Sequence, residues 1–182
     1  YSLLRESYTR KQLMERILDI GTRYLQVDHG HIVDINEEEN SWAVASSTDS
    51  PDGPYSAGLR EQLDNTYCQR TIRQENPVAI HDAKEEGMET DPVYQLHHLD
   101  TYLGIQIEAG GQPFGTLCFV SNEAREEAFS DEELIFIEIA GEVLGQALAR
   151  TQYRQEIANR DRVIEILNRV LRHNLRNELT VV

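Results

Sequence analysis

The chain has 182 residues, 40% of them hydrophobic, and its 32 acidic and 17 basic residues give a net charge of −15. This length suits one domain with a sizeable core plus an extension, and no apolar run approaches the ~20 residues that span a bilayer. The negative charge argues against nucleic acid or a membrane as a partner, and together with the scarcity of lysine (Lys11 and Lys84) it predicts a halophilic protein.

The N-terminal third predicts a helix followed by a β-hairpin. Apolar residues recur every three or four positions through residues 8–26, which is typical of an amphipathic helix. Residues 31–35 and 42–46 read as two strands joined by the polar run 36–40, so we expect an antiparallel pair. Residues 47–58 are rich in serine, proline, aspartate and glycine and follow as a loop.

The middle of the chain predicts short elements separated by acidic loops. We expect a short helix over residues 65–74 that leads into a strand over residues 77–81. Residues 81–88 are acidic and read as a loop, and residues 92–98 predict a helical turn. The clearest hairpin follows, because apolar side chains alternate on both sides of Ala109-Gly110-Gly111-Gln112.

A single long helix is predicted for the rest of the chain. Ser130-Asp131-Glu132-Glu133 is a capping box, and no proline follows it before Val182. A helix of about fifty residues would be roughly 75 Å long, which one domain of this size cannot cover. Its second half is therefore expected to form a parallel coiled coil with a second copy, and the alternative is a helix that folds back near Arg150.

The order of these elements resembles that of a GAF domain over about residues 8–150. Three phrases resemble those of haloarchaeal GAF sensors: Asn65-Thr66-Tyr67-Cys68, Tyr102-Leu103-Gly104 and Pro113-Phe114-Gly115-Thr116-Leu117-Cys118-Phe119. The resemblance implies an α+β fold with a central antiparallel sheet. It also implies that helices 8–26 and 130–150 cover one face of the sheet and that a loop-walled pocket lies on the other.

The last part of the long helix carries a second motif. Apolar residues recur every three or four positions on one side: Ile164, Leu167, Leu171, Leu175, Leu179 and Val182. His173 projects almost opposite the centre of this stripe, and Arg172 and Arg176 also lie on the exposed half, where they would neighbour a phosphate at His173. Residues 170–179 resemble the phosphoacceptor box of sensor histidine kinases, in the haloarchaeal version with His-Asn-Leu-Arg-Asn. The resemblance implies that His173 is phosphorylated from ATP and passes the phosphoryl group to a response regulator.

Two positions depart from the kinase pattern. Asn174 stands where many members carry an acidic proton acceptor, and Glu178 stands where many carry proline. We find no Gly-x-x-x-x-Gly-Lys-[Ser/Thr] loop and no second helix to complete a hairpin, and the chain begins at Tyr1 rather than at methionine. We therefore expect a fragment that accepts a phosphoryl group but does not itself take one from ATP. We expect ATP to bind only to a separate catalytic domain.

The residues do not identify a sensed ligand or a cofactor. Cys68 could anchor a bilin, but Gln69 follows it where thioether-linked sensors usually carry histidine, so a buried thiol at a helix–sheet junction is preferred. Cys68 and Cys118 lack Cys-x-x-Cys spacing, which indicates a reducing cytoplasm rather than a zinc site or a disulfide framework.

Histidines are weak candidates for a haem site. His81, His97 and His98 could ligate iron, but the adjacent pair cannot readily face one metal, so solvated side chains are preferred. His29 and His31 share a strand face without evident further ligands. No metal site is predicted.

The sequence thus predicts the signal-input module of a cytoplasmic two-component sensor kinase. Residues 1–7 would be an upstream linker, residues 8–150 the sensor domain, and residues 151–182 the signalling helix and the first part of the phosphoacceptor helix. The expected partners are a second copy, the ATP-binding domain of the parent protein-histidine kinase, a response-regulator receiver domain and a small-molecule ligand in the pocket.

The alternative is a GAF-containing transcription regulator in which the long helix is only a dimerisation coil. A GAF enzyme that reduces methionine sulfoxide would need a cysteine cluster, which two separated cysteines do not supply.

Overall fold

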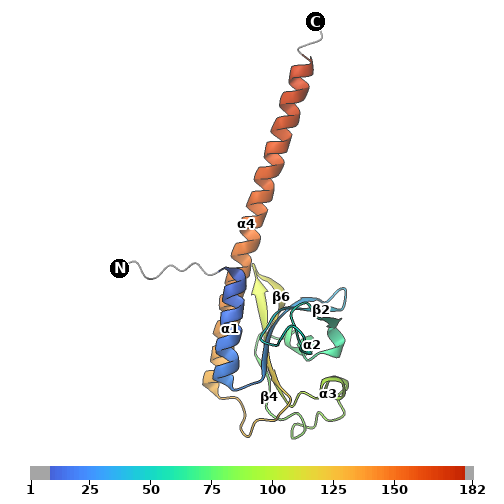
Figure 1. Ribbon diagram of the computed structural model, residues 1–182, viewed down its shortest axis with the longest axis vertical. Coiled ribbons are helices and arrows are strands. Elements are labelled where there is room, and N and C mark those ends of the chain that lie inside the picture. Colours follow the sequence, from blue (N-terminus) through green and yellow to red (C-terminus); the bar gives the residue numbers. More distant parts are fainter. Residues whose placement is uncertain (1–8, 179–182) are drawn as a thin grey trace, which may run out of the picture. The chain divides into compact units, whose positions relative to one another are not determined.

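A computed structural model describes the backbone of residues 9–178 and the side chains of residues 9–166 (Figure 1). The chain divides into two compact units, Tyr1–Ala147 and Leu148–Val182. The first unit contains a β-sheet with helices, and the described part of the second unit is helical.

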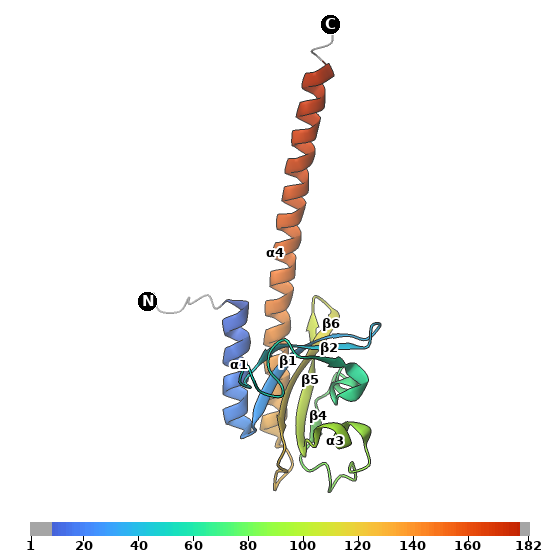
Figure 2. The same cartoon turned by 45° about the vertical axis from the view of Figure 1, so that its right-hand side comes forward.

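The first unit is built on a six-stranded antiparallel sheet with the order β3-β2-β1-β6-β5-β4 (Figure 2). The strands are β1 (His29–Asn36), β2 (Ser41–Ser47), β3 (Arg60–Gln62), β4 (Val78–Ile80), β5 (Thr101–Ala109) and β6 (Gln112–Ser121). The two predicted hairpins, β1–β2 and β5–β6, are confirmed. Strand β3 was not predicted, because its three polar residues show no alternation and acquire strand geometry only by pairing with β2.

The β5–β6 hairpin fixes which side chains share a face. Gly110 and Gly111 have φ angles of +63° and +77°, in the left-handed region that the turn between the strands requires and that glycine adopts readily. The resulting register pairs Leu103 with Phe119 and Ile105 with Leu117, so apolar side chains from both strands line one face.

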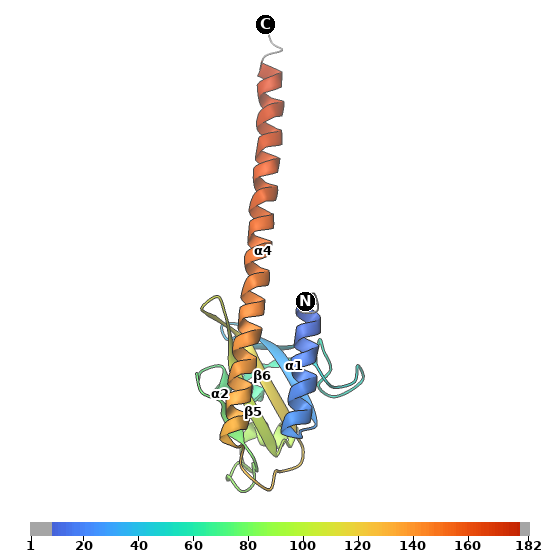
Figure 3. The same cartoon turned by 90° about the vertical axis from the view of Figure 1, so that its left-hand side faces the viewer.

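Helix α1 (Arg10–Leu25) covers this face of the sheet (Figure 3). It begins at a capping box, in which Gln12 N donates to Thr9 Oγ1 over 3.2 Å and Thr9 N donates to Gln12 Oε1 over 2.9 Å. Gly21 lies directly on the Phe119 ring, where any side chain would clash. The predicted helix and its packing against the sheet are confirmed.

Helix α4 (Asp131–Glu178) begins in the first unit, beside α1 on the same face (Figures 1 and 3). Its capping box is confirmed, since Ser130 N donates to Glu133 Oε2 over 2.8 Å and Glu133 N donates to Ser130 Oγ over 3.3 Å. The helix has 48 residues and continues through Arg150. The alternative in which it folds back near Arg150 is therefore wrong.

The opposite face of the sheet carries short helices and loops (Figure 2). A 3₁₀ helix η1 (Leu63–Asn65) precedes α2 (Cys68–Thr71), and α3 (Pro92–His97) confirms the predicted helical turn. The expected single helix over residues 65–74 is wrong, because Thr66 has extended backbone (φ −131°, ψ 154°) and separates η1 from α2. The predicted division into a helix-covered face and a loop-covered face is confirmed.

Candidate functional site

A cavity of about 350 Å³ lies in the first unit, on the loop-covered face. Strands β1, β2, β5 and β6 form its floor, and the loop before β3, the segment before α2, and α3 form its walls. The residues that line it are His31, Trp42, Pro54, Tyr55, Leu59, Glu61, Thr66, Tyr67, Cys68, Val93, Leu96, His97, Leu99, Tyr102, Cys118 and Val120. The loop-walled pocket that the GAF resemblance implies is therefore present, and residues from segments 47–58 and 81–100 contribute to its lining.

Aromatic rings dominate the wall. The Tyr55 ring centroid lies 5.2 Å from that of His31 and 6.2 Å from that of His97. The rings of Tyr67 and Tyr102 lie 5.3 Å apart on another part of the wall. Tilted aromatic pairs at such separations pack favourably and present both ring faces and ring edges to the interior.

His31 is a deeply buried titratable group of this lining, with 2% of its surface exposed. Burial, and then the neighbouring charge of His29, lower the pKa of His31 to about 4. The imidazole is therefore neutral at physiological pH and offers one donor and one acceptor.

Three polar atoms of the lining are buried without a hydrogen-bond partner among the described residues. They are His31 Nε2, Trp42 Nε1 and the Tyr67 hydroxyl oxygen. They come from β1, β2 and the N-cap of α2, and all three side chains line the same cavity.

Both cysteines line the cavity as free, buried thiols. Cys68 Sγ accepts a hydrogen bond from Thr116 Oγ1 over 3.2 Å and a longer one from the Tyr102 hydroxyl over 3.6 Å. The neighbouring Cys118 thiol, with these hydroxyls and the Trp42 side chain, lowers the pKa of Cys68. The Cys68 thiol and burial raise the pKa of Cys118. The two cysteines, which are far apart in the sequence, thus lie together in the cavity. The expected burial of Cys68 at a helix–sheet junction is confirmed.

The sequence model of the GAF domain family matches residues 7–149 of this chain. The chain belongs to the GAF domain family.

Solved GAF domains share this fold. The chain is similar to the GAF domain of an Acinetobacter phosphoenolpyruvate-protein phosphotransferase, with a TM-score of 0.66 and 15% identity over 83% of this chain and 89% of that one. It is also similar to the PixJ GAF domain of Thermosynechococcus elongatus, with a TM-score of 0.65 and 17% identity over 87% and 96% of the two chains. The phycocyanobilin-bound GAF domain of a cyanobacterial phytochrome gives a TM-score of 0.65 and 15% identity over 83% and 90%. At these identities the likeness shows the fold alone, and no curated protein matches the sequence.

The GAF fold separates the three histidines considered for haem. His97 lines the cavity, and its Nε2 lies 2.8 Å from the carbonyl oxygen of Asn65. His81 pairs with Glu85 and Glu86 outside the lining, and His98 is exposed at the C-cap of α3. Among residues whose side chains are described, no group of three or more histidine, cysteine, aspartate or glutamate side chains could hold a metal ion.

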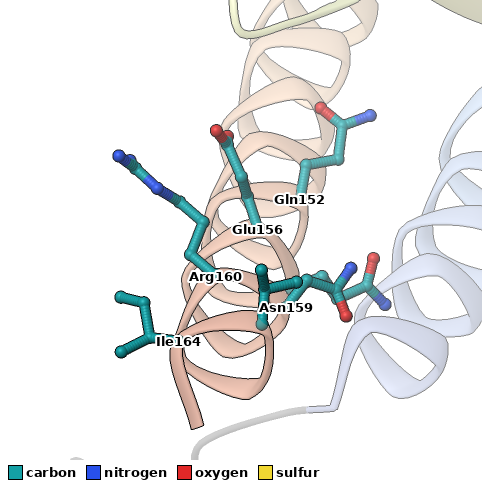
Figure 4. Close-up of a pocket in the computed structure, with 7 residues that line it drawn as sticks. Gln152, Glu156, Asn159, Arg160 and Ile164 are labelled. Carbon is teal, nitrogen blue, oxygen red and sulfur yellow. The ribbon is translucent and has the colours of Figure 1, made fainter. Parts of the chain in front are cut away.

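The phosphoacceptor candidates lie on α4 but beyond the described side chains. Backbone residues 172–176 belong to the helix, whereas the side chains of Arg172, His173, Asn174 and Arg176 are outside the described set. A shallow hollow on the second unit is bounded by Gln152, Gln155, Glu156, Asn159, Arg160, Val163 and Ile164. Figure 4 shows these side chains projecting from one helix, so this hollow is a helix flank rather than an enclosed site.

Sequence reasoning missed most of the lining. His31 was noted only for sharing a strand face with His29, and Trp42, Tyr55 and Tyr67 were not singled out. A usable signal was the GAF-like phrase that contains Tyr67, because an aromatic residue beside Cys68 on the loop-covered face is placed to enter the cavity.

No described helix combines the length and apolarity needed to cross a membrane.

Proposed function

We propose that this chain is the signal-input module of a cytoplasmic two-component sensor histidine kinase and that His173 is its phosphoacceptor. The GAF domain supplies a signal-sensing module. The observation that carries the proposal is the continuity of α4, which begins on the GAF sheet at Asp131 and reaches Glu178 without a break. The kinase-like segment is therefore covalently continuous with a helix that packs on the sensor sheet.

The residues around His173 suit phosphoryl acceptance. A neutral imidazole nitrogen would form the bond to phosphorus as the bond from phosphorus to the ADP oxygen breaks, and the ring proton would pass to solvent. Arg172 and Arg176 supply cations for the phosphoryl oxygens. Asn174 can donate or accept a hydrogen bond but cannot take the proton.

A second copy of this chain is the proposed partner of α4. In the first unit, Ile135, Ile139 and Val143 are 52%, 56% and 41% exposed at a spacing of four residues. In the second unit, Tyr153, Ile157 and Ile164 are also exposed, at spacings of four and seven. Apolar stripes of this period bury themselves against a partner helix in coiled coils.

Sedimentation in concentrated potassium chloride tests the dimer. We expect about twice the chain mass of 20.9 kDa, and Ile157→Arg should shift the protein toward the monomer. Gln155→Arg adds the same charge about 200° away around the helix and should leave the dimer intact. A wild-type monomer at tens of micromolar would contradict the proposal.

In low salt we expect unfolding or aggregation, because the excess carboxylates then repel one another unscreened.

Labelling of the full-length parent protein with γ-³²P-ATP tests the phosphoacceptor. We expect acid-labile label in the wild type and none in His173→Gln. His98→Asn is the matched control, since His98 is exposed in a left-handed conformation (φ 50°) that asparagine tolerates, and it should keep full labelling. Label that persists in His173→Gln would place the phosphoacceptor elsewhere. Absence of label in the wild type, with sequence-specific DNA binding instead, would favour the transcription regulator.

A further inference from the structure

We propose that the GAF cavity binds an uncharged, planar aromatic molecule that carries at least two hydrogen-bond acceptors. The inference extends the proposed signal-input role by naming the chemistry of the signal. Binding is measured without phosphoryl transfer, so either proposal can fail while the other stands.

Three buried polar atoms of the described lining lack a close hydrogen-bond partner. His31, Trp42 and Tyr67 are 2%, 6% and 2% exposed, and each has a buried nitrogen or oxygen that meets hydrogen-bond geometry with no other described residue. The Trp42 side chain interacts with the Cys68 thiol, and sulfur is only a weak acceptor. A buried polar group without a hydrogen bond costs free energy, so native proteins seldom keep one without a reason. Three such groups from three separate segments line one cavity, which indicates a ligand that completes their hydrogen bonds.

The chemistry of these groups limits the direction of the hydrogen bonds that they can form with a ligand. The indole N–H of Trp42 can only donate. Burial raises the pKa of Tyr67 to about 12, so its hydroxyl keeps its proton and can donate as well. Neutral His31 adds either one donor or one acceptor at Nε2, depending on its tautomer. A ligand that satisfies both donors supplies two acceptor atoms, such as carbonyl oxygens or ring nitrogens.

The size and the aromatic lining of the cavity favour a flat ligand. Rings of Tyr55, Tyr67 and Tyr102, with Trp42 and two histidines, surround a volume of about 350 Å³. This volume is at the small end of the range for small-molecule sites, and aromatic walls favour a flat, conjugated ligand. The outer lining includes Leu96, which is 54% exposed and gives an apolar ligand a route from solvent.

The lining of the cavity carries little charge. The described residues that line the cavity include no lysine or arginine, so a phosphate or carboxylate would enter without a counter-charge. Glu61 is the lining residue with a carboxylate, and its Oε1 already accepts hydrogen bonds from Gln62 N over 2.7 Å and from Asn65 Nδ2 over 2.9 Å. These bonds leave Glu61 Oε2 open, but the side chain is only partly buried, so an uncharged ligand is favoured in the buried interior of the cavity.

Coumarin is a suitable probe because it is planar, uncharged and carries two acceptor oxygens. Trp42 is the single tryptophan of the chain, so its fluorescence reports on the cavity directly. We expect saturable quenching of the 182-residue chain by coumarin. Calorimetry should give at least tenfold weaker binding for naphthalene, which lacks acceptors, and for coumarin-3-carboxylate, which is anionic. Failure of coumarin to bind, or equal affinity for naphthalene, would overturn the proposal.

Tyr67→Phe separates a binding role from a structural one. The variant should bind coumarin about fivefold more weakly by calorimetry, because one hydrogen bond is lost. It should also raise the melting temperature of the free protein by about 2–4 °C, because an unpaired buried hydroxyl is removed. Tyr24→Phe, on an exposed tyrosine of α1, should change neither quantity. A lower melting temperature in Tyr67→Phe would show that the hydroxyl serves the fold, and the proposal would fail.

Discussion

The Tyr94 hydroxyl donates a 2.9 Å hydrogen bond to Asp100 Oδ1, a carboxylate that is 7% exposed, while Lys84 Nζ lies 3.0 Å from Oδ2. Tyr94 belongs to α3, and Asp100 directly precedes β5. One buried carboxylate thus ties the wall of the cavity to the sheet that forms its floor.

Asp100→Ala should destabilise the GAF unit by about 1–3 kcal/mol in urea unfolding, because the Tyr94 hydroxyl loses its acceptor in a buried position. Asp100→Asn keeps a neutral acceptor for the Tyr94 hydroxyl and should therefore lose less stability than Asp100→Ala. Asp19→Ala, on the exposed side of α1, is the control and should leave the unfolding midpoint unchanged. If both Asp100 variants unfold at the wild-type midpoint, the link between α3 and β5 does not stabilise the fold.

Protonation of His31 should make stability depend on pH. Its pKa is lowered to about 4 in the folded protein, chiefly by burial, against ~6.5 in the unfolded chain. Above pH 6.5 the imidazole is neutral in both the folded and the unfolded state, so His31 adds no pH dependence to the free energy of unfolding. As pH falls from 6.5 toward 4, the unfolded chain binds a proton that the folded chain does not, so stability decreases by up to about 3 kcal/mol.

His31→Gln tests this dependence through urea unfolding between pH 6.5 and 5. The variant cannot take up the proton, so its stability should fall less steeply than that of the wild type over this window. Equal slopes for the two proteins would show that His31 titrates normally in the folded state.

Elements encoded by local patterns were predicted from the sequence. Helices α1 and α4 show apolar spacings of three and four, and the β5–β6 hairpin has alternation on both sides of Gly110-Gly111. Strand β3 was missed because pairing with β2, not its own residues, makes it a strand. The break between η1 and α2 was missed because it depends on the conformation of the single residue Thr66.

The cavity was harder to predict than the fold. Its existence followed from the GAF resemblance, but His31, Trp42 and Tyr67 come from three segments whose contact depends on strand register. Conversely, His97 and His98 are adjacent in sequence and point to different surroundings, since His98 takes the left-handed C-cap conformation. Proximity in the sequence was therefore a poor guide to proximity in the site.

Two glycines of α4 allow a matched test of its packing on β5. A Cβ at Gly145 would clash with the backbone carbonyl oxygen of Glu108, which cannot move without disturbing the strand. A Cβ at Gly141 would lie 3.0 Å from Ile105 Cγ2, a side-chain atom that can shift.

Gly145→Ala should therefore destabilise the protein in thermal unfolding, although alanine favours helix by about 1 kcal/mol over glycine. Gly141→Ala should be near neutral, because the gain in helix propensity offsets a small shift of Ile105. Stabilisation by both substitutions to a similar extent would indicate that α4 does not approach β5 closely in solution.

Phosphorylation of His173 should slow at acidic pH. Because Asn174 cannot act as a base, the attacking nitrogen must already be unprotonated, and imidazolium has no lone pair with which to attack phosphorus. With an ordinary histidine pKa of ~6.5, the initial rate of labelling in the full-length kinase should fall about tenfold for each pH unit below that value.

Asn174→Asp supplies a proton acceptor at the adjacent position and should raise the rate at neutral pH. The binding of ATP, followed separately with a fluorescent analogue, should stay constant over the same range if the loss arises at His173. A rate that is flat from pH 7.5 to 5.5 would contradict attack by a neutral imidazole.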